Sequence, residues 1–287
     1  MLKKLLTFVF AGIFAFTLAA CDLDPDTETV ELGYVNWAEG VAMNYLAHAI
    51  LEDEMGYEVE SRMADAGPIY GSLASGNTDA FLDAWYPFTH QTYRDEYGDL
   101  IEDLGYNFEG AKIGLVVPEY VDIDSIAEMN DYADEFDNQI VGIDPGAGIM
   151  GAASDAIDVY NLDDIDLQTS SGPVMVQALS EAIDDGEWVV VTGWEPHFKF
   201  ADYDLKFLED PEGTFGESEN IHTVARAGLS EDMPEVAEFL SNFYLDSEQL
   251  GNLMGMMNEH GDDYSELEIA RMWMAENEEL VQSWLPE

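Results

Sequence analysis

The stretch EWVVVTGWEPH, from Glu187 to His197, has the pattern of a buried strand that ends in a tryptophan, Trp194. The stretch DAFLDAWYPFTH, from Asp79 to His90, repeats this plan: an apolar run, then Trp85, then a proline and a histidine. Short apolar runs bounded by Gly or Pro are typical of strands that are buried on both faces of a sheet. Both stretches therefore favour α/β architecture.

Strand and helix patterns alternate on both sides of these stretches. Two blocks of similar plan, residues 30–110 and 139–210, each begin with a strand and end with a strand tipped by Trp-x-Pro. Such alternation is typical of α/β domains with largely parallel sheets. We therefore predict two lobes that face each other across a cleft. Lobe I is assigned residues 30–115 with 224–287, and lobe II residues 116–223.

The chain must cross between the lobes twice, and we place the crossings in the strands near Val116 and Thr223. Three terminal helices then return to lobe I, beginning near three aspartates: Asp232, Asp246 and Asp262. In the last of these helices, Trp273 and Trp284 share one helical face with two aliphatic residues, so we expect them in the core.

The N-terminus has the pattern of an export signal. Two lysines and a short apolar run precede LAAC, which ends at Cys21, and the run is too short to span a bilayer. Small residues before a cysteine resemble a bacterial lipobox, which implies cleavage after a signal peptide of residues 1–20 and lipidation of Cys21. Residues 21–29 would then be a lipidated tether. The alternative is an ordinary signal with a chance cysteine. Cys21 is the single cysteine, so no disulfide can form within the chain.

The charge excludes some functions. The chain has 61 acidic residues against 9 basic ones, a formal net charge of −52. Nucleic-acid binding needs Lys and Arg, so we expect no nucleic-acid partner. Self-repulsion of this size is screened in concentrated salt, where the Debye length falls to about 3 Å at roughly 1 M. The composition therefore suggests a protein that faces brine.

Three tryptophans share one kind of position. Trp37, Trp85 and Trp194 each lie at the C-terminal end of a predicted strand, where open parallel sheets bind their ligands. Facing indoles bind quaternary ammonium groups through the negative faces of their rings. The alternative is that these side chains seal the edge of the cleft or fill the core.

An anion site is predicted opposite the indoles. VGIDPGAGIM, residues 141–150, is a strand that enters a Gly-rich turn and a helix, whose free N–H groups favour an anion. The alternative is a tight strand–helix connection capped by Asp144. His90 can donate one hydrogen bond to a carboxylate. His197 can do the same or brace its loop.

These segments, together with GYVNWAEGVA, KIGLVVPEY and IHTVARAGLS, resemble the substrate-binding proteins of glycine betaine ABC importers, the OpuAC/ProX-like family. The resemblance covers nearly the whole mature chain and implies a two-lobed periplasmic-binding-protein fold of type II. It implies that Trp37, Trp85 and Trp194 form a box around the trimethylammonium group. It also implies that the ligand carboxylate is bound by His90 and by two backbone amides. Those amides are Gly142 and Ile143, with Asp144, Pro145 and His197 in supporting positions.

The resemblance implies a lipid-anchored receptor that captures glycine betaine and delivers it to a permease and its ATPase. It would work on the outer face of the cytoplasmic membrane, without a cofactor, a metal or catalysis. Receptors for carnitine, proline betaine or choline, and a sensing lipoprotein without a transporter, remain alternatives. A hydrolase is disfavoured because the chain has no Gly-x-Ser-x-Gly elbow, no His-Glu-x-x-His and no cysteine nucleophile.

Overall fold

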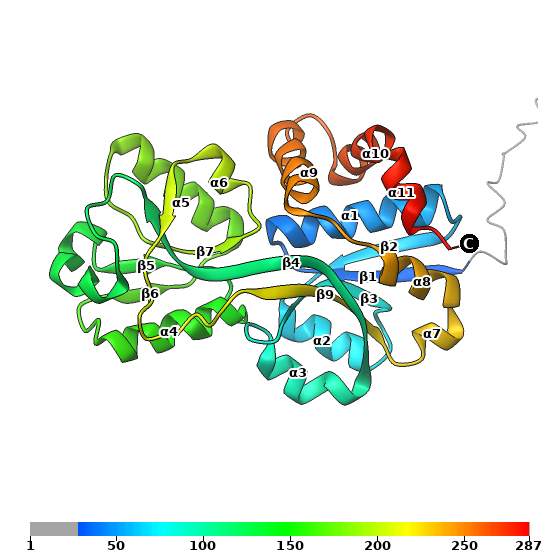
Figure 1. The fold of residues 1–287 in the computed structure, drawn as a ribbon, viewed down its shortest axis with the longest axis horizontal. Helices are drawn as coiled ribbons and strands as arrows, with labels where there is room; N and C mark the ends of the chain where they lie inside the picture. Colours follow the sequence, from blue (N-terminus) through cyan, green and yellow to red (C-terminus); the bar gives the residue numbers. More distant parts are fainter. Residues whose placement is uncertain (1–27, 287) are drawn as a thin grey trace, which may run out of the picture.

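The structure is a computed structural model that describes residues 28–286 (Figure 1). The predicted signal peptide, the lipidation site Cys21 and most of the tether lie outside the described residues. The first strand begins at Thr29, so the segment predicted as a tether ends at least one residue earlier than expected. Within residues 28–286, no helix combines the length and the apolar character that a membrane span requires.

Lobe I, on the right in Figure 1, is built on a sheet with the strand order β2-β1-β3-β9-β4. Its strands are β1 (Thr29–Tyr34), β2 (Glu58–Met63), β3 (Ala80–Tyr86), β9 (Glu219–Arg226) and the first part of β4 (Ile101–Pro118). Helices cover both faces of the sheet. They are α1 (Ala38–Asp53), α2 (Ala66–Ala74), α3 (Gln91–Tyr97), the 3-10 turn η1 (Gly98–Leu100), α7 (Leu229–Asp232), α8 (Pro234–Asn242), α9 (Ser247–His260), α10 (Glu266–Glu276) and α11 (Glu278–Trp284).

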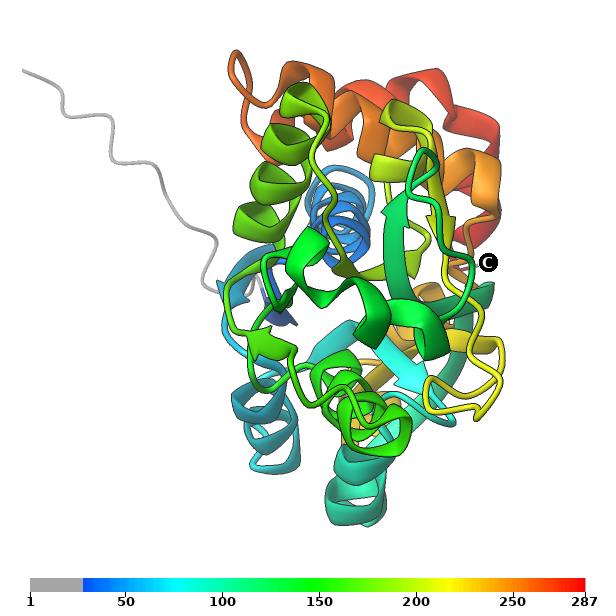
Figure 2. The ribbon, with the colours of Figure 1, turned by 90° about the vertical axis from the view of Figure 1, so that its left-hand side faces the viewer.

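Lobe II, which faces the viewer in Figure 2, is built on the remainder of β4 with the order β4-β7-β5-β6. Its strands are β5 (Gln139–Val141), β6 (Asp166–Gln168), β7 (Val191–Glu195) and β8 (Leu205–Phe207), which pairs with β4. Its helices are η2 (Ile126–Phe136), α4 (Gly148–Tyr160), α5 (Gly172–Asp185) and α6 (Lys199–Asp202). The α/β class and the two-lobed plan predicted from the sequence are confirmed.

The long strand β4 joins the two lobes (Figure 1). It pairs with β9 as far as Ala111 and with β7 from Lys112 onward. The chain crosses back from lobe II to lobe I before Glu219, because β9 pairs only with strands of lobe I. Sheet pairing therefore changes about four residues before each crossing predicted near Val116 and Thr223. The strand β4 continues without a break through the point where it changes partner, so its sequence does not mark the crossing.

The sheets are less parallel than predicted. Each lobe has three parallel strands, β2-β1-β3 and β6-β5-β7, which follow the same order along the chain. The strands between these triplets, β9 and β4, pair antiparallel with each other and with their neighbours. A chain that leaves one lobe and comes back must run in opposite directions, so the two linking strands lie antiparallel.

The C-terminal region has more helices than predicted. The helix expected from Asp262 begins at Glu266, where the Ser265 side chain caps the first turn. It breaks at Asn277, so Trp273 and Trp284 lie in the separate helices α10 and α11. Both indoles are nonetheless buried in the core, as their spacing indicated. The backbone at Asn277 leaves the helical region, with φ −121° and ψ 32°, and this starts the new helix.

Candidate functional site

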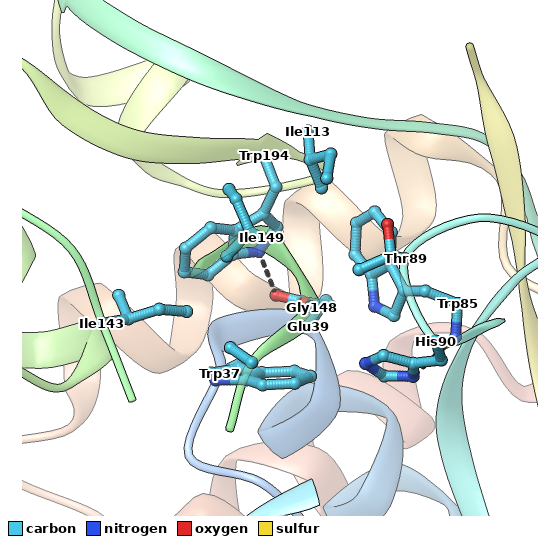
Figure 3. A pocket seen from close by; sticks show the side chains of 11 residues that line it. Trp37, Glu39, Trp85, Thr89, His90, Ile113, Ile143, Gly148, Ile149 and Trp194 are labelled. Atoms are coloured by element: carbon cyan, nitrogen blue, oxygen red, sulfur yellow. Dashed lines mark hydrogen bonds between the residues drawn. The ribbon is translucent and has the colours of Figure 1, made fainter. Parts of the chain in front are cut away.

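A small hollow lies between the lobes, where strand ends and helix starts of both lobes meet (Figure 3). Lobe I contributes Trp37, Glu39, Trp85, Thr89 and His90 to its wall, and lobe II contributes Ile113, Ile143, Ala147, Gly148, Ile149 and Trp194. The structure therefore brings together the three predicted tryptophans, the predicted histidine and one of the two predicted amide residues.

The repeated strand plan puts the indoles at this place. Trp37 lies just after β1 and precedes the first turn of α1 as its N-cap residue, and its side chain is buried. Trp85 lies in β3 opposite Ile221, and Trp194 lies at the equivalent position of β7 opposite Ile113. Each of these two strands ends in a cis X–Pro bond. The indoles therefore enter the hollow from strand ends, as the sequence predicted.

A carboxylate accepts the N–H of each indole. Trp85 Nε1 donates to Asp83 Oδ1 at 2.8 Å, two residues back on the same strand. Trp194 Nε1 donates to Glu39 Oε2 at 2.7 Å, and Trp37 Nε1 donates to Asp144 Oδ2 at 3.1 Å. A satisfied N–H fixes the plane of each ring and leaves the apolar ring surface for the hollow.

Four hydrogen bonds connect the lobes across the cleft. Two are the indole bonds to Glu39 and Asp144, each of which joins a ring of one lobe to a carboxylate of the other. The third runs from the Tyr93 hydroxyl in α3 to the carbonyl oxygen of Gly146, at 2.7 Å. The fourth runs from Asn258 Nδ2 in α9 to Asp202 Oδ2 in α6, at 2.9 Å. The structure is therefore the closed arrangement, in which the aromatic walls face one another.

Two buried carboxyl groups bond to the indoles, and the sequence analysis did not select either one: Glu39 lines the hollow and Asp83 does not. Burial, with the nearby Asp83 charge, holds the pKa of Glu39 well above its usual range. Burial also raises the pKa of Asp83 to about 7. A side chain at Gly40 would collide with the Asp83 carboxylate, so the glycine in NWAEG lets the two acids approach. Gly40, directly after Glu39, was the one feature of the sequence that could have pointed to this pair of acids.

His90 is fixed as a neutral donor. Its Nδ1 accepts from the backbone N–H of Trp85 at 3.1 Å and lies 3.2 Å from the Tyr70 hydroxyl. A backbone amide can only donate, so Nδ1 is unprotonated and the proton of the neutral ring is on Nε2. Nε2 is buried without a partner in the part of the chain that the structure describes. Burial lowers the pKa of His90 to about 3, so the ring carries no charge near neutral pH.

The backbone amides differ from the prediction. The Gly142 N–H donates to the carbonyl oxygen of Gln168 at 2.9 Å, and Gly142 does not line the hollow. The Ile143 N–H reaches only Met150 Sδ, at 3.2 Å, and thioether sulfur is a weak acceptor. Gly148 and Ile149 begin α4 and line the hollow, and their N–H groups have no recorded partner among residues 28–286.

The close approach of the lobes explains the glycine at the start of α4. A β-carbon at Gly148 would collide with the carbonyl oxygen of Thr89, which belongs to the other lobe. Glycine therefore lets the first amides of a 13-residue helix reach the hollow, and a helix start favours negative charge. The motif GIDPGAGIM contains Gly-Ile twice, and the sequence alone pointed to the first copy instead of the second.

The supporting residues lie outside the hollow. Asp144 accepts from Trp37, and Pro145 lines a groove on the α3 side of the cleft. The ring of His197 packs edge-on against Trp194, with the centroids 4.9 Å apart, and its Nδ1 accepts from the Lys199 N–H. Glu219, which sequence reasoning missed, accepts from the N–H groups of Phe88 and Thr89 at 2.8 and 3.1 Å. It holds the loop that leads to His90.

Among residues 28–286, no group of three or more His, Cys, Asp or Glu side chains is arranged to hold a metal ion.

The sequence and structure match known substrate-binding proteins. The family model described as the substrate binding domain of ABC-type glycine betaine transport systems matches residues 28–276. A Listeria monocytogenes protein named glycine betaine/carnitine transport binding protein is 42% identical over 156 residues, 54% of this chain and 51% of the relative. The match therefore spans about half of that relative's length.

Three solved structures share the fold along most of the chain. ProX from Borrelia burgdorferi is 34% identical with a TM-score of 0.87, over 91% of this chain and 97% of that one. Lactococcal OpuAC, closed on glycine betaine, is 36% identical with a TM-score of 0.84, over 90% and 100%. A choline-binding protein in complex with choline is 27% identical with a TM-score of 0.83, over 89% and 91%.

These matches confirm the resemblance predicted from the sequence, and the expected fold. The family consists of substrate-binding domains, which agrees with the expectation of a binding protein and not an enzyme. The chain belongs to the OpuAC family, the substrate-binding domains of ABC-type glycine betaine transport systems.

Proposed function

We propose that this chain captures glycine betaine, or a closely related quaternary amine, as the receptor of an ABC importer. One observation carries the proposal: three indoles and a neutral histidine donor line a single hollow between closed lobes. A betaine has a permanent cation without N–H groups at one end and a carboxylate at the other. The hollow offers a surface suited to each.

The cation end is served by Trp37, Trp85 and Trp194. A desolvated cation over an indole face contributes about 2 kcal/mol, so three such contacts suffice to select a quaternary ammonium group. The carboxyl oxygens of Glu39 and Asp83 accept the N–H bonds of Trp194 and Trp85 and so orient these two rings. A primary amine would gain less, because none of the ring faces accepts N–H bonds as a carboxylate does.

The carboxylate end is served by His90 Nε2 and by amides at the start of α4. We assign Gly148 and Ile149 this role beside Ile143, in place of Gly142, whose N–H is already bonded to Gln168. Hydrogen bonds to a charged group contribute about 1.5–3 kcal/mol each. Choline has no carboxylate and would leave the buried His90 donor unpaired.

The wider setting is also part of the proposal. The receptor would deliver its ligand to a permease and ATPase at the outer face of the cytoplasmic membrane, tethered through lipid on Cys21. The proposed lobes are residues 30–115 with 224–287 and residues 116–223, with the sheet pairing changing slightly earlier. The fold class supports capture by closure of the two lobes around a ligand.

Related ligands are the second candidate, and the named relatives favour them. The listerial relative is named for glycine betaine and carnitine, and one structural neighbour holds choline. Proline betaine has the same two charged ends as glycine betaine. The small hollow favours the smallest betaine, because longer side arms would meet the walls between the lobes.

Calorimetric titration of the mature chain tests the proposal. Glycine betaine should give saturable binding with a dissociation constant near the micromolar range, and choline should bind more weakly. Glycine, which lacks the three methyl groups, is the matched control and should give no saturable signal. Saturable binding of glycine with none of glycine betaine would overturn the proposal.

A further inference from the structure

Lys199 is a fully buried lysine with an unusual location. It begins α6, and its Nζ lies 4.3 Å from the centroid of the Trp194 ring and 5.1 Å from that of Phe200. Its recorded side-chain hydrogen bond goes to the carbonyl oxygen of Trp194, at 3.4 Å. Trp194 lines the hollow and Lys199 does not, so the ammonium covers the ring from the side away from the ligand.

The charges around Lys199 come from several elements. Glu39 of α1 and Glu195 of β7 attract it, although neither carboxylate is in contact with Nζ among the described ion pairs. Asp83 of β3 interacts with the charge of Glu39, and the ring of the neutral His197 packs edge-on against Trp194. Lys112 of β4 pairs with Glu195 at 3.2 Å and takes up part of its charge.

Burying an ammonium group needs a physical reason. Burial lowers the pKa of Lys199 to about 7, because water no longer solvates the charge. An unbranched apolar side chain of the same length would pack between these rings without that cost. The ammonium therefore has an effect on the molecule that packing alone does not explain.

We propose that Lys199 is a specificity-determining residue that disfavours purely cationic quaternary amines relative to zwitterionic ones. The inference rests on the proposed function, because it needs a quaternary ammonium on the front face of Trp194. A cation there and the Lys199 ammonium behind would share one indole and repel each other. In a betaine, the carboxylate of the ligand offsets this repulsion, whereas choline has no negative group.

The expected change in ligand affinity follows from the distance between the two positive charges. Two unit charges about 9 Å apart, on opposite sides of a ring, interact at an effective dielectric constant of about 20 strongly enough to change affinity roughly tenfold. For a zwitterion the two charges of the ligand partly cancel, so the effect is about threefold or less. Lys199 therefore changes choline affinity more than glycine betaine affinity, and so changes the ratio of the two.

The test is Lys199→Met in the mature chain, titrated with glycine betaine and choline at constant ionic strength. Choline affinity should rise roughly tenfold, while glycine betaine affinity changes about threefold or less. Lys206→Met is the matched control, because Lys206 pairs with Asp124 at the surface of the same lobe. That variant should leave both affinities unchanged. Lys199→Gln, which keeps a polar group without charge, should behave like the methionine variant.

Choline titrations at a series of pH values separate the effect of the Lys199 charge from the effect of its side-chain shape. Between about pH 6 and 9 the wild-type lysine loses its proton, so the difference in choline affinity between wild type and Lys199→Met should shrink as pH rises. Taking this difference removes the titration of Asp83, which both proteins share. A difference that stays constant with pH would mean that side-chain shape is responsible and would overturn the inference.

The outcomes distinguish the two proposals. If wild type binds neither glycine betaine nor choline, the proposed function fails and the inference fails with it. If wild type binds glycine betaine but Lys199→Met leaves the ratio to choline unchanged, only the inference is overturned. Thermal melting of each variant shows whether it is folded, and the wild-type pH series reports on Lys199 without any substitution.

Discussion

Two loops of nearly identical plan line the cleft and differ in what they contact. The Trp85 loop, Asp83–His90 of lobe I, bonds its indole N–H to its own Asp83 and leaves the histidine donor free in the hollow. The Trp194 loop, Thr192–Lys199 of lobe II, bonds its indole N–H to Glu39 across the cleft and packs its histidine behind the ring. The same sequence pattern therefore gives two different parts of a site.

The two loops differ in whether their contacts exist before the lobes close. All contacts that orient Trp85 and His90 lie within lobe I, so this half of the site exists whether the lobes are open or closed. Trp194 acquires its Glu39 partner only when the lobes meet. We infer that a ligand first rests on the Trp85 loop and that the Trp194 loop completes the box on closure.

The largest expected effect comes from exchanging the two indoles for phenylalanine. Both Trp194→Phe and Trp85→Phe keep an aromatic face and lose an N–H donor. Trp194→Phe also breaks a link between the lobes and leaves Glu39 without its donor, which costs about 1–3 kcal/mol. It should weaken betaine binding by tenfold to a hundredfold, and by more than Trp85→Phe does.

Titration calorimetry measures the two affinities, and small-angle scattering measures how compact each variant is. Trp194→Phe should be more open than wild type with ligand absent, and Trp85→Phe should not. Equal losses of affinity with unchanged compactness in both variants would contradict the division into a preorganised loop and a closing loop.

The histidines give the next effect. His90→Ala removes the buried donor, so betaine affinity should fall about tenfold while choline affinity changes little, since choline has no carboxylate. His197→Ala removes packing against Trp194 and the acceptor of the Lys199 N–H, and since His197 does not line the hollow it should change both affinities by less than about threefold. Titration of the two ligands into both variants measures this. A larger loss of betaine affinity in the His197 variant would reverse the roles.

The sequence could predict the plan of the fold because strand and helix periodicity repeat in both blocks. It also located the three indoles, since strand ends are visible as apolar runs that stop at Trp-x-Pro. It could not choose between the two Gly-Ile pairs, because this depends on Gln168 pairing with Gly142. Glu39 and Asp83 were not selected, because Glu39 finds its partner Trp194 only in the opposite lobe, and Lys199 was not selected because its side chain is buried against Trp194 and Phe200.

The last prediction concerns the stability of the ligand-free chain and Asp83, the acid that keeps the Trp85 indole within its own loop. Burial raises its folded pKa to about 7, above the unfolded value near 4, so the folded state binds the extra proton. Stability from this group is then fully present below about pH 4 and is lost as pH rises through 7. Asp83→Asn keeps an acceptor for Trp85 Nε1 and cannot titrate.

Urea unfolding of the ligand-free chain from pH 4 to 8, at constant high salt, measures this contribution. The free energy of unfolding of wild type relative to Asp83→Asn should decline by one to a few kcal/mol over that range. Glu39→Gln should show a decline of the same sign, because its folded pKa is also raised. Only the Glu39 variant should also lose compactness, since its partner lies across the cleft. A relative stability of wild type that rises with pH would show that both acids are stabilised in their charged form, which would contradict a dry site behind the indoles.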